Sequence, residues 1–510
     1  MPQNSRDPGR ASSLALFSAL FFMAAAVYAV LFVFDFALRG VGFWQTLMSK
    51  DNVAVLINSG DIMVSVLGVV ITVVALTLEL AATRYSPRIP TVFLQDQTNQ
   101  IVLAFYVVSS ALVVWFNLSL HGDPLPRAMF FADVTLMTLV ILSVLPYFAY
   151  VFDFVSPTRF VARLSDQARE SILRASVEFK PQARVDTLAA VAQLGEIARQ
   201  SVEARDRAIA VAAISALVDV AAISVERKGV QKPEWFETYD LLRADEDFVA
   251  WHRDVLRRID ERRTFLELKV LRQLQALYVD VVGEDQDMTH LCAIQVRRLA
   301  TRAAECGDVE VTRLCVRFLN TFFRFAVNSK DVRTGYNLLN EYRLLAEALL
   351  HTPEHAVAVE VAQFVQSYGQ LGFKARLAFL LETAAYDLCT LLEVAHAADA
   401  PEHDALLSVF LTLDLEPDAT TERDPSLRGV RKAQIKLATY YLSCGEEPRA
   451  KQIWADMVAE DPARIRGLVE EIDRTTQEEF WEISDRGTNF DWLSAARRAH
   501  LKTFASWSGA

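Results

Sequence analysis

The chain has 510 residues, which exceeds the size of one compact core and predicts at least two structural units. Hydrophobic residues make up 52% and the net charge is −12, but residues 1–155 contain only seven Lys/Arg and nine Asp/Glu, so most of the charge lies in residues 156–510. An acidic second part lacks the clustered Lys and Arg that bind phosphates, which excludes nucleic acid as an expected partner.

An apolar run from Leu14 to Phe34 follows a polar N-terminus and is too long for the apolar region of a secretory signal. Further apolar stretches follow, each long enough as a helix to cross a bilayer. The sequence therefore predicts a four-helix transmembrane domain in residues 1–155, with spans at about 14–37, 58–83, 100–120 and 128–153.

The basic residues of the short loops predict the orientation of these spans. With the N-terminus inside, the inner side holds Arg6, Arg10, Arg84, Arg88, Arg159 and Arg163, and the outer side holds Arg39, Lys50 and Arg127. This excess predicts that the N-terminus and the large C-terminal part are both cytoplasmic.

The second span carries polar and small residues along one side of the helix, at steps of three and four. We refer to these positions as the polar seam: Asp61, Ser65, Gly68, Thr72, Ala75 and Glu79. Its carboxylates fall near opposite membrane interfaces, where charge is less costly than at the midplane. Two interpretations stay open, a packing seam of small residues and the lining of an ion or solute path.

A loop with two prolines follows the second span and leads into the third. Pro87 and Pro90 are expected to stop the helix and hold the chain extended, and Phe93 and Leu94 to form a short interfacial helix. The loop is interpreted either as an anchoring turn or as a coupling element between the span and the cytoplasmic part. We refer to the following residues as the joint: Arg84, Tyr85, Ser86, Pro87, Arg88, Asp96, Asn99 and Gln100.

A Ser-Pro-Arg turn, then Phe-Leu-x-Asp, then Asn-Gln opening the next helix, resembles a family of predicted bacterial inner-membrane proteins, domain-of-unknown-function family 2254. The resemblance covers residues 60–155 and continues weakly at 232–237, 265–278 and 331–350. It implies a multi-span N-terminal part in the bacterial inner membrane and supplies no activity.

The second part shows helical periodicity with turn signals about one helix apart. The expected fold is therefore all-α, with a cytoplasmic α-helical, solenoid-like domain in residues 156–400 and a C-terminal helical segment in 401–510. Within that segment, residues 431–462 resemble one degenerate tetratricopeptide hairpin, with Gly445 at its turn and Pro462 at its end. The basic, aromatic tail from Asp491 is expected either to lie on the membrane or to cap the helical stack.

Residues that would carry chemistry are sparse. No phosphate-binding loop, nucleophile motif or metal-ligand motif occurs, so we expect no enzyme activity, no metal and no cofactor. His351 and His355 have a superficial metal spacing, but Thr352 and Pro353 between them predict a helix start that separates the two side chains. The odd number of unpaired cysteines predicts reduced thiols in a cytosolic domain: Cys292, Cys306, Cys315, Cys389 and Cys444.

Two functions from different classes remain. In the first, the protein is a homo-oligomeric channel-like or transporter-like assembly with a regulatory cytoplasmic domain, and the polar seam lines its path. In the second, it is a membrane-anchored helical scaffold that recruits a cytosolic protein partner. The lipid bilayer is the expected surrounding of the spans in both.

Overall fold

The computed structural model describes residues 59–84, 89–119, 127–414 and 427–507, with a few residues between 22 and 34. The chain forms two compact units, residues 1–160, called the membrane unit below, and residues 161–510, called the helical unit. Within the described residues the regular structure is helical apart from one isolated bridge, between Glu479 and Thr488. The all-α fold is confirmed, and the further division at residue 400 stays a prediction.

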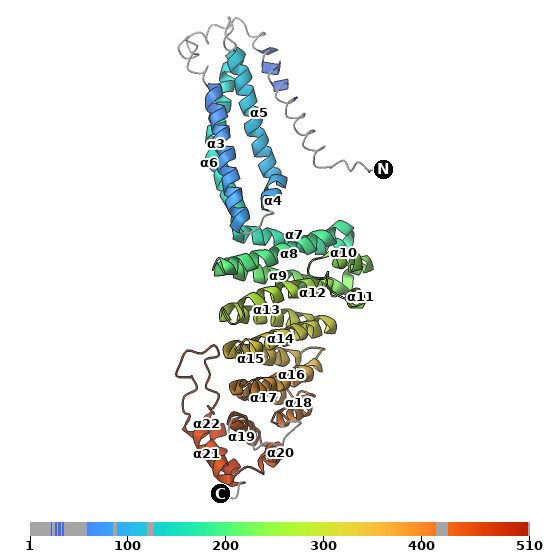
Figure 1. Cartoon of the computed structure of the whole chain (residues 1–510), viewed down its shortest axis with the longest axis vertical. Helices are drawn as coiled ribbons and strands as arrows, with labels where there is room; N and C mark the ends of the chain where they lie inside the picture. Colours follow the sequence, from blue (N-terminus) through green and yellow to red (C-terminus); the bar gives the residue numbers. More distant parts are fainter. Residues whose placement is uncertain are drawn as a thin grey trace. The chain divides into compact units, whose positions relative to one another are not determined.

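Three long helices make up the described core of the membrane unit: α3 (Ser59–Arg84), α5 (Gln97–Ser119) and α6 (Arg127–Val155). They contact one another pairwise, and the short α4 (Ile89–Gln95) connects α3 to α5 (Figure 1). These helices coincide with the predicted spans at 58–83, 100–120 and 128–153. The span at about 14–37 lies largely outside the described residues, although Leu31 packs against Phe116, Val108, Leu112 and Met129.

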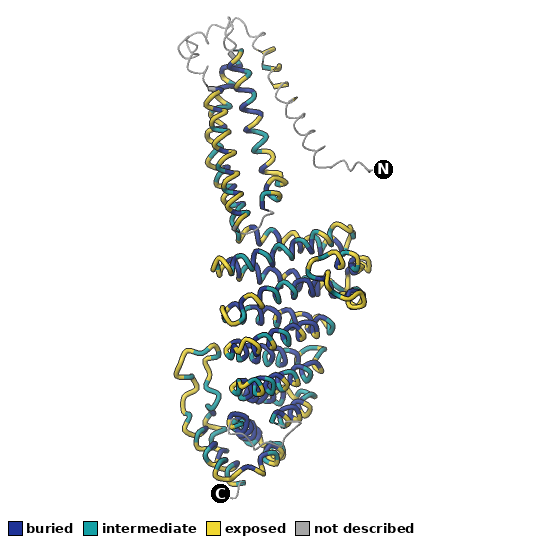
Figure 2. The backbone as a smooth tube through the Cα atoms, in the orientation of Figure 1, coloured by how far each residue is buried: buried dark blue, intermediate teal, exposed yellow. Residues whose placement is uncertain are grey.

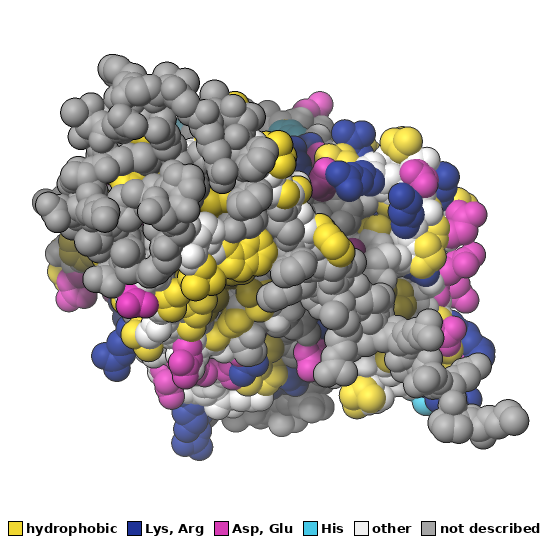
Figure 3. Space-filling view, turned by 90° about the horizontal axis from the view of Figure 1, so that it is seen from above, with side chains coloured by type: hydrophobic (Ala, Val, Ile, Leu, Met, Phe, Trp, Pro, Cys, Tyr) yellow, Lys and Arg dark blue, Asp and Glu magenta, His cyan; other side chains and the backbone are white. Residues whose placement is uncertain are grey.

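The three long helices of the membrane unit have exposed positions along their whole length (Figure 2), and many of these residues are apolar. On α3, Ile62, Val69 and Leu80 are exposed while Met63 and Val70 are buried. Seen end-on, hydrophobic side chains gather in one area of the described surface (Figure 3). Such extended apolar faces are rare on soluble proteins and suit helices that face lipid.

A fourth described helix is long and apolar enough to cross a membrane, and it lies in the helical unit. This helix is α9 (Arg207–Arg227), whose neighbours α8 (Pro181–Glu203), α12 (Phe265–Val281) and α13 (Gln286–Glu305) pack around it. More of its apolar window is buried, 61%, than in any of the three helices above. A helix that is apolar on all sides is expected where protein covers it on all sides.

The helical unit is a stack in which successive helices lie side by side (Figure 1). Its longer helices, besides α8, α9, α12 and α13, are α7 (Pro157–Val177), α14 (Val309–Asn328), α15 (Val332–Leu349), α16 (Val357–Lys374), α17 (Ala378–Ala397), α19 (Arg428–Ser443) and α21 (Pro462–Arg474). The shorter helices are η2 (Lys228–Val230), η3 (Pro233–Phe236), α10 (Tyr239–Ala244), α11 (Arg253–Arg262), α18 (His403–Leu411), α20 (Glu447–Met457), α22 (Ala495–Arg498) and α23 (Leu501–Ser506).

One turn design joins many of these helices. After α8, Arg205 adopts φ 57°, and the N–H of Asp206 donates to the carbonyl of Ser201 at 2.8 Å, which satisfies the end of the helix. The Asp206 carboxylate then accepts from the N–H of Ile209 and starts α9. The same pairing of a left-handed residue with a capping aspartate recurs at Gly307–Asp308 and Lys330–Asp331. A left-handed residue followed directly by aspartate thus reverses the chain within three residues.

Two expectations about helix starts were wrong. Thr352 does not cap a helix, because α16 begins at Val357; its hydroxyl instead accepts from the N–H of Glu354 in the preceding turn at 3.2 Å. Pro90 does not end a helix or hold the chain extended, because it is the second residue of α4, where a missing N–H has no cost. The short helix expected around Phe93 is present as α4, and its interfacial position stays a prediction.

The C-terminal tail packs on the helical unit. Leu501 and Phe504 are buried, and the ring of Phe504 lies 5.4 Å from that of Trp454 on α20. The helical hairpin expected at 431–462 is formed by α19 and α20, with Gly445 in the left-handed region at φ 82°. Of the two interpretations of the tail, the structure favours the cap on the stack, since the large apolar side chains of the tail pack against the helical unit.

Candidate functional site

The polar seam lies on the side of α3 that turns away from the other described helices. Its members Asp61, Ser65, Gly68, Thr72 and Glu79 are all exposed, whereas Met63, Val70, Val74 and Leu78 face the bundle. The structure therefore brings the seam residues together along one face but packs no described helix on it. Packing seam and solute path both stay predictions.

The seam hydroxyls are satisfied within their own helix. Ser65 donates to the carbonyl of Asp61 at 2.7 Å, and Thr72 donates to the carbonyl of Gly68 at 2.8 Å. Asp61 lies in the first turn of α3, where a carboxylate stabilises the positive end of the helix dipole. The hydroxyls thus need no external partner, and the two carboxylates are the groups of the seam that need water or a cation.

The joint is only partly within the described residues. Tyr85, Ser86, Pro87 and Arg88 lie outside them, as does the side chain of Arg84. Asp96 caps the N-terminus of α5, since its carboxylate accepts from the N–H of Asn99 at 3.0 Å. The Asn99 side chain donates to the carbonyl of Phe93, and that of Gln100 to the carbonyl of Leu94, at 3.1 and 2.9 Å.

Tyrosines of α6 complete the joint. The hydroxyl of Tyr147 donates to Asn99 Oδ1 at 2.7 Å, and that of Tyr150 donates to the Asp96 carboxylate. The ring of Phe93 on α4 meets that of Phe154 edge to face at 5.1 Å. Three helices are thus tied by a polar cluster inside an apolar bundle, where such bonds fix helix positions. The arrangement anchors the short α4, and its chemistry suits a structural clamp.

A second cluster, of charged side chains, lies in the helical unit where the ends of α9, α13 and α15 meet. Arg207, at the start of α9, lies 3.3 Å from Asp285 and 3.0 Å from Asp287. Arg333 on α15 lies 3.5 Å from the same Asp287. We call the hollow of about 820 Å³ beside these residues the charged cleft; it is also lined by Arg199, Arg205 and Asp280.

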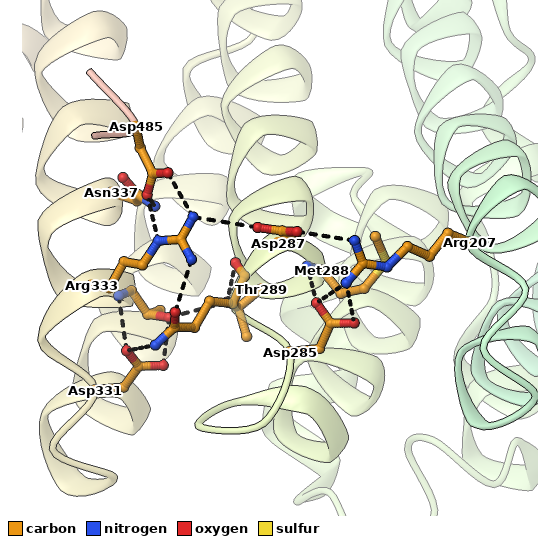
Figure 4. A network of polar contacts seen from close by, with 11 residues as sticks. Arg207, Asp285, Asp287, Met288, Thr289, Asp331, Arg333, Asn337 and Asp485 are labelled. Atoms are coloured by element: carbon orange, nitrogen blue, oxygen red, sulfur yellow. Dashed lines mark hydrogen bonds and ion pairs between the residues drawn. The ribbon is translucent and has the colours of Figure 1, made fainter. Parts of the chain in front are cut away.

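The charged cleft continues into a remote part of the chain through Arg333 (Figure 4). The Arg333 guanidinium holds Asp485 in a two-bond pair at 2.8 and 2.6 Å, and Asn337 donates to the same carboxylate at 2.8 Å. These hydrogen bonds lower the pKa of Asp485 to about 2. Acidic and basic side chains therefore alternate from α9 to residue 485 and pair with one another.

Further ion pairs cross the gap between α9 and α13 on the same face. Arg298 and Arg302 on α13 pair with Asp219 and Glu226 on α9 at 3.3 and 2.8 Å, and all four side chains are substantially exposed. We refer to this exposed side of α9, α13 and α15 as the charged face. Among the described residues, no group of three or more His, Cys, Asp or Glu is arranged to hold a metal ion.

Sequence reasoning missed both clusters. Tyr147 and Tyr150 gave a weak signal, as two phenols three residues apart in an otherwise apolar span, but nothing pointed to Asn99 and Asp96 as their respective partners. The charged face left no local signal, because Arg207, Asp287, Arg333 and Asp485 are separated by long stretches of chain and meet only through the stacking of helices.

Residues 11–224 match the family described as predicted membrane protein, DUF2254. The match runs from residue 11 to α9 and confirms the expected family resemblance over residues 60–155; it does not include the weaker continuation expected at 232–237, 265–278 and 331–350. No curated protein and no solved structure matches the chain.

Proposed function

We propose that this protein, which carries the DUF2254 region of predicted membrane proteins, is a membrane-anchored helical scaffold that recruits a protein partner on its charged face. In this proposal α3, α5 and α6 serve as the anchor, in a bacterial inner membrane. The stack acts as an α-solenoid in the cytoplasm, as the basic loop residues predict. The role is non-enzymatic. The observation that carries the proposal is the charged cleft, whose exposed, alternating charges exceed what anchoring requires.

Site-specific photocrosslinking in native membranes tests this proposal. Val211, one turn after Arg207 on α9, and Val255 on α11 are equally exposed at 39%, so a photoreactive residue at each gives a matched pair. We expect a discrete crosslinked protein from position 211 and none from position 255. We also expect the reversals Arg207→Glu and Asp287→Lys to remove the crosslink, because rim charges steer and orient a partner. Equal crosslinking at both positions, or insensitivity to the reversals, would contradict the proposal.

A second candidate function, a homo-oligomeric channel-like or transporter-like assembly, is favoured by one observation. The polar seam of α3 carries Asp61 and Glu79 on a face that no described helix covers, and carboxylates within a bilayer usually face protein or water. A second copy of the chain would supply such a surface, and copies together would enclose a path.

Reconstitution separates the two functions. A channel predicts an oligomer in detergent and ion flux in liposomes that the double variant Asp61→Asn, Glu79→Gln abolishes. The same substitutions leave partner crosslinking at position 211 unchanged if the protein is a scaffold. A monomer without flux excludes the channel.

A further inference from the structure

A C-terminal segment lies along the stack as an extended strap. We define the strap as residues 478–491, which follow α21 and precede α22. It folds back on itself, with the N–H of Asn489 donating to the carbonyl of Glu478 at 2.8 Å, and it reaches α15 beside the stack (Figure 1). Its partners on α15 and α17 are about a hundred residues or more distant in the sequence.

Arg486 is the deepest anchor of the strap. Its guanidinium donates to the buried Asp387 on α17 at 2.7 Å and to the carbonyl of Tyr336 on α15. It also lies over the ring of Tyr336, 4.0 Å from the centroid. The Arg486 side chain is only 9% exposed, so residues of α15 and α17 enclose it almost completely.

Three more side chains hold the middle and the C-terminal end of the strap. Asp485 takes the two-bond pair with Arg333 described above. The ring of Phe490 stacks on Tyr386 of α17 at 4.7 Å, and Asp491 accepts from Tyr386 and from Lys432 of α19, each at 2.6 Å. Side chains of α15, α17 and α19 therefore recognise the pattern Asp-Arg-x-x-x-Phe-Asp.

Apart from these anchors the strap is not part of the core, and its most exposed side chains precede Asp485. None of the residues 473–492 is buried, Trp481 is 75% exposed and Ile483 is fully exposed. A pocket of about 650 Å³ separates part of the strap from Tyr336 and Phe379 on the stack. A segment held by a few side chains above an unfilled pocket has the contacts of a bound ligand, since hot-spot residues carry most of the energy of such interfaces.

We propose that α15, α17 and α19 form a binding site for an extended peptide, and that the strap is its internal occupant. The partner segment carries the strap's own pattern, an Asp-Arg pair followed four residues later by Phe-Asp, and it binds by displacing the strap. This inference goes beyond the proposed scaffold function, because the peptide site lies on α15, α17 and α19 and shares only Arg333 with the charged cleft. Because the strap is tethered, its effective concentration is on the order of millimolar, and a free peptide competes poorly until the strap is weakened.

Peptide binding to the full-length protein in detergent tests the inference. The probe is a labelled peptide spanning residues 483–493, and the control peptide carries Ala in place of its Arg. We expect weak binding to the wild-type protein and about tenfold or tighter binding to the strap variant Arg486→Ala, Phe490→Ala. Adding Lys432→Gln or Arg333→Gln to the strap variant removes a charged partner of the peptide on the stack. Either substitution is expected to reverse that gain. A folded strap variant that does not bind the probe overturns the inference.

Hydrogen exchange of the wild-type protein gives a second readout that requires no variant to fold. The amides of Phe480 and Asn489, which bond across the strap, are expected to exchange much faster than those of α17, because the strap opens locally. If these two amides exchange only when the whole protein unfolds, the strap is a fixed part of the fold and the inference is overturned. Crosslinking at position 211 reports on the charged cleft and not on the strap. Loss of that crosslink therefore contradicts the scaffold proposal, whereas absence of peptide binding contradicts only the peptide-site inference.

Discussion

Buried ionisable side chains set how the helical unit responds to pH. Glu267 on α12 is fully buried, and Lys228 Nζ lies 3.8 Å from its Oε1 while pairing more closely, at 2.5 Å, with Asp308. Burial raises the pKa of Glu267, and the attraction of Lys228 does not offset it. A carboxyl whose folded-state pKa is raised stabilises the fold while protonated, so the free energy of unfolding falls as the pH rises through that pKa.

Replacing Glu267 by Gln is therefore expected to stabilise the protein, by on the order of 1 kcal/mol, because it removes a poorly compensated buried charge. The gain is expected to grow in thermal unfolding as the pH rises above the ordinary pKa range of a carboxyl group. Glu310→Gln serves as the control, since Glu310 is 39% exposed and forms a surface pair with Arg262 at 3.4 Å. A gain independent of pH would show that Glu267 is not the titrating group.

Tyr147→Phe tests the clamp in the membrane unit. The substitution leaves Asn99 Oδ1 without its hydrogen bond in a buried site, and the expected loss is about 1 kcal/mol, as for other bonds between membrane helices. Unfolding in mixed micelles measures the loss. Tyr150→Phe provides the comparison, because the Asp96 carboxylate would still accept a hydrogen bond from the N–H of Asn99. A larger loss of stability for Tyr150→Phe than for Tyr147→Phe would place the main clamp at Asp96.

At the scale of elements, close approach of helices depends on a few glycines. A Cβ on Gly369 of α16 would lie 2.8 Å from that of Ala384 on α17, too near for either helix to keep its place. A Cβ on Gly467 of α21 would meet no atom within 4 Å. The α16–α17 hairpin thus requires its glycine, and α21 does not.

Gly369→Ala and Gly467→Ala are expected to have opposite effects. The first is expected to lower the free energy of unfolding by about 1–3 kcal/mol through overpacking. The second is expected to raise it by about 0.5–1 kcal/mol, because alanine loses less backbone entropy in a helix. Chemical denaturation of both variants measures the difference, and a stabilising Gly369→Ala would mean that the hairpin can open at that position.

For the whole molecule, the position of α9 decides how much of the chain belongs to the membrane. By composition α9 qualifies as a span, but α8, α12 and α13 cover it, and Arg207 and Glu226 at its ends pair with α13 or the turn before it. Most of its apolar window is therefore covered by protein, and its exposed side carries charged side chains such as Asp219 and Glu226.

Residues 161–510 expressed without the membrane unit are accordingly expected to be soluble and helical. Fractionation after cell lysis and circular dichroism measure this outcome. Residues 1–160 expressed alone are expected to require detergent and provide the matched comparison. Extraction of 161–510 only with detergent would show that α9 or another face of the stack lies in the bilayer.

The sequence by itself determined the helical class and the three described apolar helices of the membrane unit, because helix period and apolar length act over a few residues. It also determined which side of α3 carries the polar seam. Only the tertiary structure decided that α9 is covered by protein, that Tyr147 reaches Asn99, and that Asp485 and Arg486 lie against α15 and α17. These pairings depend on how helices stack over long sequence separations, and no local pattern encodes the partner of a side chain that far away.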